Sequence, residues 1–268
     1  MVQSYLQRFH LQPAFPTDVH RAAAEAVVDY FAPLPRIQAV LLTCSCARGR
    51  AAPESCVDMA VLLDPGDLPL FRDQESARLN AFLASNAACV ALQRRVPWGG
   101  AEMDRISGEF TPGEHHFTSG PDDYELEIGN ALAWVHPLLL RGPRFEALQT
   151  QYLPYYDEEK RQQRLRMVIR FAANNLEHIV PFARRGLYEQ SFKRLYHAFE
   201  EYLQALFIQR RLYPIAYDKW LREQLVDYLG EPELHAELLS ILAMPSFSVR
   251  RFADRARRLR ALLDTLSS

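Results

Sequence analysis

The spacing of hydrophobic and polar residues changes along the chain, and the change falls near residue 150. In the first half, residues 17–32 place apolar side chains three and four positions apart behind two capping residues, which predicts an amphipathic helix. Two prolines follow and end it. Short apolar runs at 37–43 and 57–63, each bounded by polar residues, predict two buried strands.

The stretch from the second strand to residue 150 predicts a further helix and more strands. The helix is expected over 74–88, and the strand candidates are Val90–Val96, Met103–Phe110, the shorter His115–Thr118, and Tyr124–Ile128. In the last of these, apolar residues alternate with Glu125 and Glu127, so a strand would put both glutamates on one face.

Beyond residue 150 the pattern has the period of a helix. Residues 188–206 carry large apolar side chains at four- and three-residue spacing, and 165–179 carry a similar stripe. Pieces near 218–229, 231–243 and 248–266 complete a bundle of about five helices. We therefore expect an α+β protein with an N-terminal domain over 1–150, a mixed sheet flanked by helices, and an all-α helical bundle over 151–268.

Composition excludes several classes of protein. The chain has 268 residues, 49% hydrophobic and 24% charged, which rules out a disordered chain, a fibre and a miniprotein. Its net charge of −2 gives no global field for nucleic acid or membrane. The halves differ, since residues 1–150 hold 12 basic and 18 acidic side chains (−6) and residues 151–268 hold 19 and 15 (+4).

Four cysteines lie in the first half, and the longest apolar runs fall short of the ~20 residues that a membrane span needs. With no secretory signal recognisable, we expect a soluble cytoplasmic protein with reduced thiols. The spacing of Cys44, Cys46 and Cys56 matches no zinc motif, so we interpret these residues as small buried side chains.

The segment Leu41–Asp64, LLTCSCARGRAAPESCVDMAVLLD, carries the chemistry. One strand ends, a short loop presents Ser45, and a second strand opens with Asp58. A serine hydroxyl and backbone amides at such a turn can hold phosphate oxygens. A carboxylate on the next strand can hold a divalent cation beside them.

These residues resemble the nucleotidyltransferase superfamily, the polymerase-beta-like fold that includes DNA polymerase beta and the aminoglycoside nucleotidyltransferases. Its signature is Gly-Ser, then Ala-Arg-Gly one residue on, then Ser-Asp-x-Asp before an apolar strand. The residues kept here at matching intervals are Ser45, Ala47, Arg48, Gly49, Ser55 and Asp58. The helical C-terminal region is similar to the aminoglycoside-modifying branch, in which such a domain helps to bind the acceptor.

The resemblance implies a function and a set of roles. It implies transfer of a nucleoside monophosphate, AMP being favoured, from ATP or another NTP to a hydroxyl of a small-molecule or protein acceptor, with two Mg²⁺ ions. Ser45, Ala47, Arg48, Gly49 and Ser55 would contact the nucleotide phosphates. Asp58 and a third acid would hold the metal; Glu125 and Glu127 lead as that third acid, ahead of Asp104 and Glu109.

Two departures make the motif degenerate. Cys44 stands where the signature has glycine, and Cys56 stands where it has the first of the paired aspartates. A thiol is soft and, with an ordinary pKa near ~8.5, largely neutral at pH 7, whereas Mg²⁺ takes hard oxygen ligands. The alternative function is therefore an inactive nucleotidyltransferase fold that senses a ligand or binds a partner. Neither nucleic acid nor membrane is expected as a partner, and a homodimer is compatible with the sequence.

Overall fold

The computed structural model describes residues 2–266, and this stretch of the chain forms two compact units. Unit 1 comprises the residues up to Phe110 together with Glu127–Pro154. Unit 2 comprises Thr111–Leu126 and the residues from Tyr155 on. The domains predicted from the sequence are each continuous, whereas unit 2 also takes in the short segment 111–126.

Unit 1 is built on a mixed sheet of four strands in the order β3-β2-β1-β4. Strand β1 (Ile37–Leu42) is antiparallel to β2 (Val57–Leu63) and to β4 (His136–Leu140), while β2 is parallel to β3 (Ala101–Ile106). The predictions of strands at 37–43 and 57–63 are thus confirmed, and so is the α+β class.

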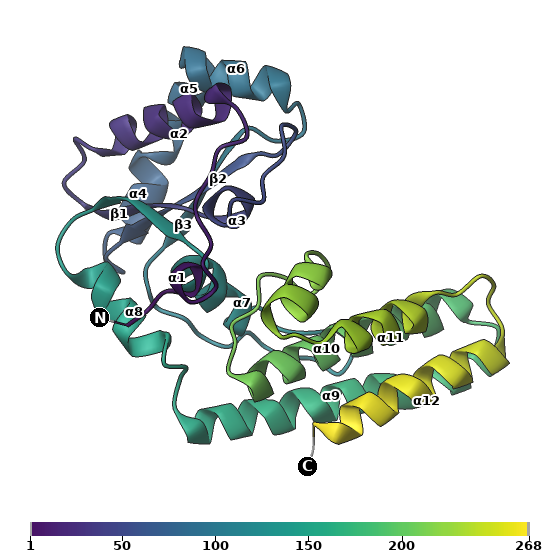
Figure 1. Cartoon of the computed structure of the whole chain (residues 1–268). Coiled ribbons are helices and arrows are strands. Elements are labelled where there is room, and N and C mark those ends of the chain that lie inside the picture. Colours follow the sequence, from purple (N-terminus) through teal and green to yellow (C-terminus); the bar gives the residue numbers. More distant parts are fainter. Residues whose placement is uncertain (1, 267–268) are drawn as a thin grey trace. The chain divides into compact units, whose positions relative to one another are not determined.

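Helices cover the sheet of unit 1, as Figure 1 shows for α2 (Asp18–Phe31), α5 (Ser76–Ser85) and α6 (Ala87–Arg95). Apolar side chains of these helices and of alternate positions on β1 and β2 form one buried core, which includes Val27, Phe31, Val40, Met59 and Val61. The remaining helical elements of the unit are α1 (Tyr5–Arg8), α3 (Cys44–Ala47), α4 (Leu68–Gln74), the π-helix η1 (Gly129–Ala133) and α8 (Arg144–Tyr152).

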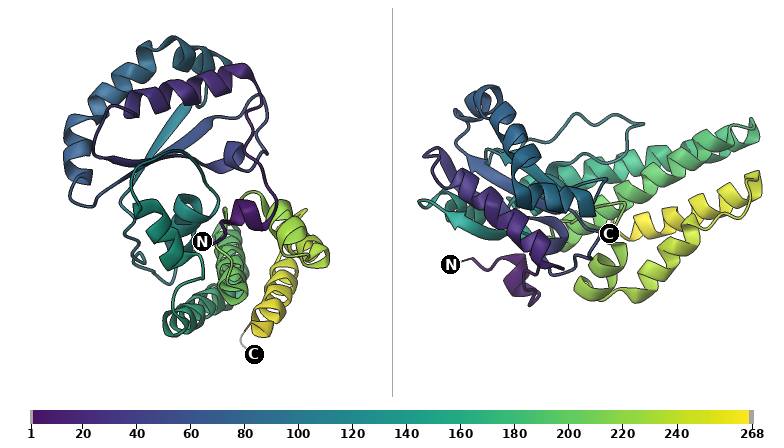
Figure 2. Two further views of the ribbon diagram at one scale, coloured as in Figure 1. Left: turned by 60° about the vertical axis from the view of Figure 1, so that its left-hand side comes forward. Right: turned by 90° about the horizontal axis from the view of Figure 1, so that it is seen from above.

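Unit 2 is helical. Helices α9 (Glu158–Arg184), α10 (Tyr188–Arg210) and α12 (Val249–Thr265) pack side by side (Figures 1 and 2), and α11 (Pro232–Leu242) and the π-helix η2 (Glu223–Tyr228) complete the unit. The predicted apolar stripes are the buried faces: Leu195, Phe199, Tyr202 and Leu206 lie inside on α10. This confirms that the C-terminal region is helical.

The prediction of a strand at Val90–Val96 is wrong, because all of these residues except Val96 belong to α6, and Val96 directly follows that helix. Asn86 begins that helix, since its side-chain oxygen accepts hydrogen bonds from the backbone N–H groups of Ala88 (3.0 Å) and Cys89 (3.3 Å). The apolar run then buries Cys89 and Leu92 at helical spacing. A short apolar run cannot distinguish a buried strand from a buried helix; here the cap decides.

The prediction of a strand at Tyr124–Ile128 is also wrong, since these residues form the short helix α7. His115–Thr118 is not a strand either, and only the first residues of Met103–Phe110 are extended, because β3 ends at Ile106. The alternation of Tyr124, Leu126 and Ile128 with two glutamates has the period of a strand. A polar cluster inside unit 2 that includes Glu125 overrides it.

That cluster is centred on Arg164 of α9. Its guanidinium forms ion pairs with Asp122 (2.6 Å) and Glu125 (2.5 Å), and all three side chains are buried. Gln204 of α10 donates to both carboxylates, at 2.8 and 2.9 Å, and the Tyr156 hydroxyl donates to Glu125 at 2.6 Å. The cluster ties the segment 111–126 to α9 and α10.

Within residues 2–266, no helix combines the length and the apolar character needed to cross a lipid bilayer.

Candidate functional site

The loop after β1 brings Ser45 to the end of the sheet at which β2 begins. The two strands are antiparallel, with Leu42 opposite Met59, and the Thr43 N–H donates to the Asp58 carbonyl at 2.9 Å. Helix α3 follows at once, and Ser45 is its second residue. The hydroxyl and the carboxylate that the sequence selected therefore belong to the same end of neighbouring strands.

The backbone of this loop uses conformations that favour glycine. Cys44 has φ of 51° and Gly49 has φ of 67°. A Cβ on Gly49 would lie 2.4 Å from the Gln12 carbonyl oxygen, so the loop packs directly against the N-terminal segment. Ala47 and Arg48, predicted to contact phosphate, are both buried. Cys44 thus occupies, with strain, the position where the nucleotidyltransferase signature has glycine.

Ser55 organises the turn before β2. Its hydroxyl oxygen accepts from the Ala52 N–H at 2.9 Å, and its carbonyl lies 2.9 Å from Nε2 of the buried His20. Because a carbonyl only accepts hydrogen bonds, His20 carries its proton on Nε2. The sequence assigned Ser55 to the nucleotide; these contacts give it a structural role in the turn.

Cys56 is the residue on which the chemistry depends. Its thiol donates to the Asp58 carboxylate, with Sγ 3.1 Å from Oδ1 and 3.2 Å from Oδ2. Burial, this hydrogen bond and the negative charge of Asp58 raise the pKa of Cys56 to about 12. Burial and the same carboxylate raise the pKa of Cys46 to about 12 as well. Both thiols are therefore protonated at neutral pH.

Strand β3 supplies acidic side chains beside Asp58. In the parallel register, Asp58 lies opposite Glu102 and Ala60 opposite Asp104, so the three acids share one face of the β2–β3 pair. Desolvation and the charge of Asp58 raise the pKa of Asp104 above its ordinary value. Asp104, a secondary candidate in the sequence, is thus the carboxylate that the fold couples to Asp58.

The two leading candidates for the third acid do not share a face. Glu125 lies in unit 2, fully buried and held by Arg164, whereas Glu127 is exposed and lies in unit 1. Residues two apart on a helix point in different directions, whereas on a strand they would align. Glu125 is committed to its ion pair and has no carboxylate oxygen to spare for a metal.

The residues around Asp58 do not fit a pair of Mg²⁺ ions. A protonated thiol offers neither charge nor a hard oxygen ligand, and this one engages both oxygens of Asp58. Among the side chains that the structure describes, no group of three or more from His, Cys, Asp and Glu is arranged to hold a metal ion. Glu109, the last of the sequence candidates, is an exposed residue beyond the end of β3.

The sequence analysis placed Asp104 behind Glu125 and Glu127 as the third acid, although the residues around Asp104 have an alternating pattern that favours it. Glu102 and Asp104 alternate with the apolar residues Ala101 and Met103, as in a half-buried strand. That pattern predicts that the two acids share a face.

No protein-family model and no curated protein sequence matches the chain. Among solved structures, the chain is similar to a nucleotidyltransferase-like protein from Exiguobacterium sibiricum 255-15, with a TM-score of 0.44 and 13% sequence identity. The similarity covers 91% of this chain and 74% of that one.

Proposed function

We propose that this chain is a nucleotidyltransferase-like protein that has lost two-metal catalysis and acts by binding a ligand or a partner. One observation carries the proposal: the protonated Cys56 thiol stands in the place of a metal-binding aspartate and donates its hydrogen bond to the Asp58 carboxylate. The retained loop at Ser45 supports descent from such an enzyme.

The electrostatics favour loss of catalysis. Two dications and a triphosphate are held in such enzymes by carboxylates that are all ionised. Here one negative charge is replaced by a neutral thiol, and Asp104 already ionises less readily beside Asp58. A second Mg²⁺ would therefore meet too few negative charges and too few oxygen ligands.

The test compares three forms of the whole protein: wild type, Cys56→Asp, and Cys56→Ser as the matched control without the acid. Titration with Mn²⁺, which replaces Mg²⁺ and is detected by electron paramagnetic resonance, measures metal binding. We expect weak binding by wild type and Cys56→Ser and at least tenfold tighter binding by Cys56→Asp. Metal-dependent turnover of labelled ATP by wild type, abolished by Asp58→Asn, would overturn the proposal.

A second candidate function is retained nucleotidyl transfer with one metal ion, and the adjacency of Asp58 and Asp104 favours it. In that case Ser45 and the loop amides would hold the phosphates of ATP or another NTP, for transfer to a hydroxyl of a small molecule or of a protein. Incubation with labelled ATP and an acceptor panel tests it. Label transfer lost in both Asp58→Asn and Asp104→Asn would establish it.

A further inference from the structure

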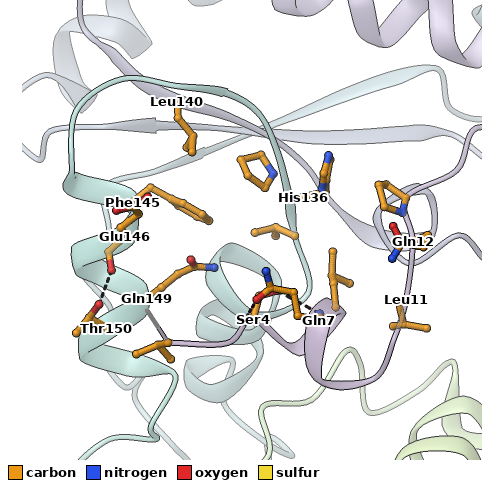
Figure 3. Close-up of a pocket in the computed structure, with 15 residues that line it drawn as sticks. Ser4, Gln7, Leu11, Gln12, His136, Leu140, Phe145, Glu146, Gln149 and Thr150 are labelled. Carbon is orange, nitrogen blue, oxygen red and sulfur yellow. Dashed lines mark hydrogen bonds between the residues drawn. The ribbon is translucent and has the colours of Figure 1, made fainter.

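A cavity in unit 1 lies outside the Ser45–Asp58 site. Three segments far apart in the sequence enclose it: the N-terminal segment from Val2 to Pro13, strand β4 with the residue before it, and helix α8 (Figure 3). None of the residues predicted to contact a nucleotide or a metal lines it. Its volume is about 540 Å³, within the range of pockets that hold small organic molecules.

The walls are partly apolar and partly polar. Phe145 of α8 and Leu140 of β4 supply apolar surface, while Gln7, Gln12 and Gln149 supply side-chain amides. Such a mixture suits a ligand with an apolar body and one or two polar groups.

The charged side chains that line the cavity are of one sign. Among the described residues that line the cavity, Glu146 is the only acidic one, and neither lysine nor arginine is present. Burial lowers the pKa of His136 below its ordinary value, so its imidazole is neutral at pH 7. The wall therefore has a negative group and no compensating cation.

The arginines nearest in sequence are engaged elsewhere. The guanidinium of Arg8, the residue after Gln7, lies over the rings of Tyr5 and Phe9, 5.6 and 5.1 Å from their centroids. Arg141 donates to the carbonyls of Leu34, at 2.8 Å, and Ala32. Arg144 pairs with Asp64 at 3.2 Å and donates to the Ser107 carbonyl at 2.6 Å. Phosphate and carboxylate ligands would thus meet Glu146 without a cation to bind them, which disfavours anions.

Several polar groups of the wall are fixed in place before any ligand arrives. Gln149 donates through Nε2 to the Leu132 carbonyl at 2.9 Å, and the Gln7 side chain accepts from the Ser4 N–H at 3.0 Å. The Thr150 hydroxyl donates to the Glu146 carbonyl at 2.8 Å, a bond drawn in Figure 3. Groups held in this way lose little conformational freedom when a ligand binds.

We propose that this cavity is a binding site for a small organic amine, an apolar body of one or two rings with a single ammonium group. The body lies against Phe145 and Leu140, and the ammonium group pairs with the Glu146 carboxylate. This site does not depend on the fate of catalysis at Asp58, because the two sets of residues are separate.

The experiment uses three probes that share an indole body and differ in charge: tryptamine (cation), tryptophol (neutral) and indolepropionate (anion). Isothermal titration calorimetry on the full chain measures each affinity. We expect tryptamine to bind about fivefold more tightly than tryptophol, because Glu146 is exposed and an exposed ion pair contributes at most about 1 kcal/mol, and we expect indolepropionate not to bind.

Three variants locate the site. Glu146→Gln is expected to remove the preference for tryptamine over tryptophol, whereas Glu25→Gln, which changes an exposed glutamate of α2, is its matched control and leaves the preference intact. Leu140→Trp fills the cavity from a side chain that is 44% exposed, so it blocks binding without disturbing the core. Circular dichroism spectra confirm that each variant is folded.

Two results would overturn the proposal: equal binding of indolepropionate and tryptamine, or tryptamine binding unchanged in Glu146→Gln and Leu140→Trp. Failure of all three probes to bind would also overturn it. None of these outcomes bears on metal binding by Cys56→Asp, so this proposal and the proposed function fail independently.

Discussion

Replacing Arg164 by methionine should destabilise unit 2 strongly, because it removes the only cation bonded to two buried carboxylates among the described residues. Asp122 accepts two hydrogen bonds from this guanidinium, at 2.6 and 3.0 Å, and Glu125 accepts two more, at 2.5 and 2.7 Å. Breaking a buried ion pair by removing one partner costs about 3–5 kcal/mol. That is a large fraction of the ~5–15 kcal/mol that holds a typical domain together.

The loss of stability in Arg164→Met should also depend on pH, and the environment of Asp122 gives the direction of that dependence. Burial raises the pKa of Asp122, but the hydrogen bonds and charge of Arg164 outweigh it and hold that pKa below its ordinary value. The wild type therefore keeps this stabilising contribution above the ordinary pKa and loses it as the pH falls through the lowered value. In Arg164→Met the lowering effect of the guanidinium is lost, so the pKa of Asp122 rises, and the stability deficit of the variant should narrow as the pH falls from about 7 to about 5.

Urea denaturation followed by far-ultraviolet circular dichroism measures this free energy of unfolding. Arg166→Met is the matched control, since Arg166 is exposed on the same helix, and its change should stay within about 0.5 kcal/mol. A loss below about 1 kcal/mol in Arg164→Met, or a deficit that is the same at both pH values, would refute the assignment of Glu125 to a structural ion pair.

Three further predictions concern single residues. Cys44→Gly should raise the free energy of unfolding by up to about 1 kcal/mol, since φ is 51° there; a loss in thermal unfolding experiments would contradict this strain. Gly49→Ala should cost more than about 2 kcal/mol, because φ is 67° and the new Cβ would meet the Gln12 carbonyl oxygen at 2.4 Å; an unchanged urea midpoint would disprove the close approach. Burial and the charge of Asp218 raise the pKa of Glu200 to about 7, so its contribution to stability is present below its ordinary pKa and lost as the pH rises through 7. Glu200→Gln should therefore stabilise the protein by about 1–2 kcal/mol above neutral pH and not at about pH 4, and denaturation at both values checks it.

Local patterns were enough to predict much of the fold. Strands β1 and β2 are short apolar runs between polar loops, and α10 carries an unbroken apolar stripe, and in these segments the local pattern agrees with the element that forms. The wrong prediction at Val90–Val96 overlooked a local cap, Asn86, whereas the one at Tyr124–Ile128 concerns a segment whose conformation depends on a residue far away in the sequence. Arg164, some forty residues downstream, holds Glu125 in place and so overrides the alternating pattern of α7.

The sequence predicts some features of the candidate site and not others. The proximity of Ser45 and Asp58 follows from two neighbouring strands joined by a short loop, which the sequence displays. The protonation of Cys56 depends on burial and on the orientation of its thiol toward Asp58, and neither can be read from spacing. The cavity beside Glu146 is lined by three segments that are far apart in the sequence, so no local pattern predicts it.

The state of the Cys56 thiol tests the central claim most directly. In a variant with Cys44, Cys46 and Cys89 replaced by alanine, serine and alanine, the thiolate absorbance in the ultraviolet reports the ionisation of Cys56 alone from about pH 6 to about pH 9, below the ordinary tyrosine pKa of ~10. Our account predicts a thiol that stays protonated well past neutral pH, with a pKa of about 12. A thiolate already formed at or below the ordinary pKa of ~8.5 would contradict it, because an ionised Cys56 could not donate a hydrogen bond to Asp58.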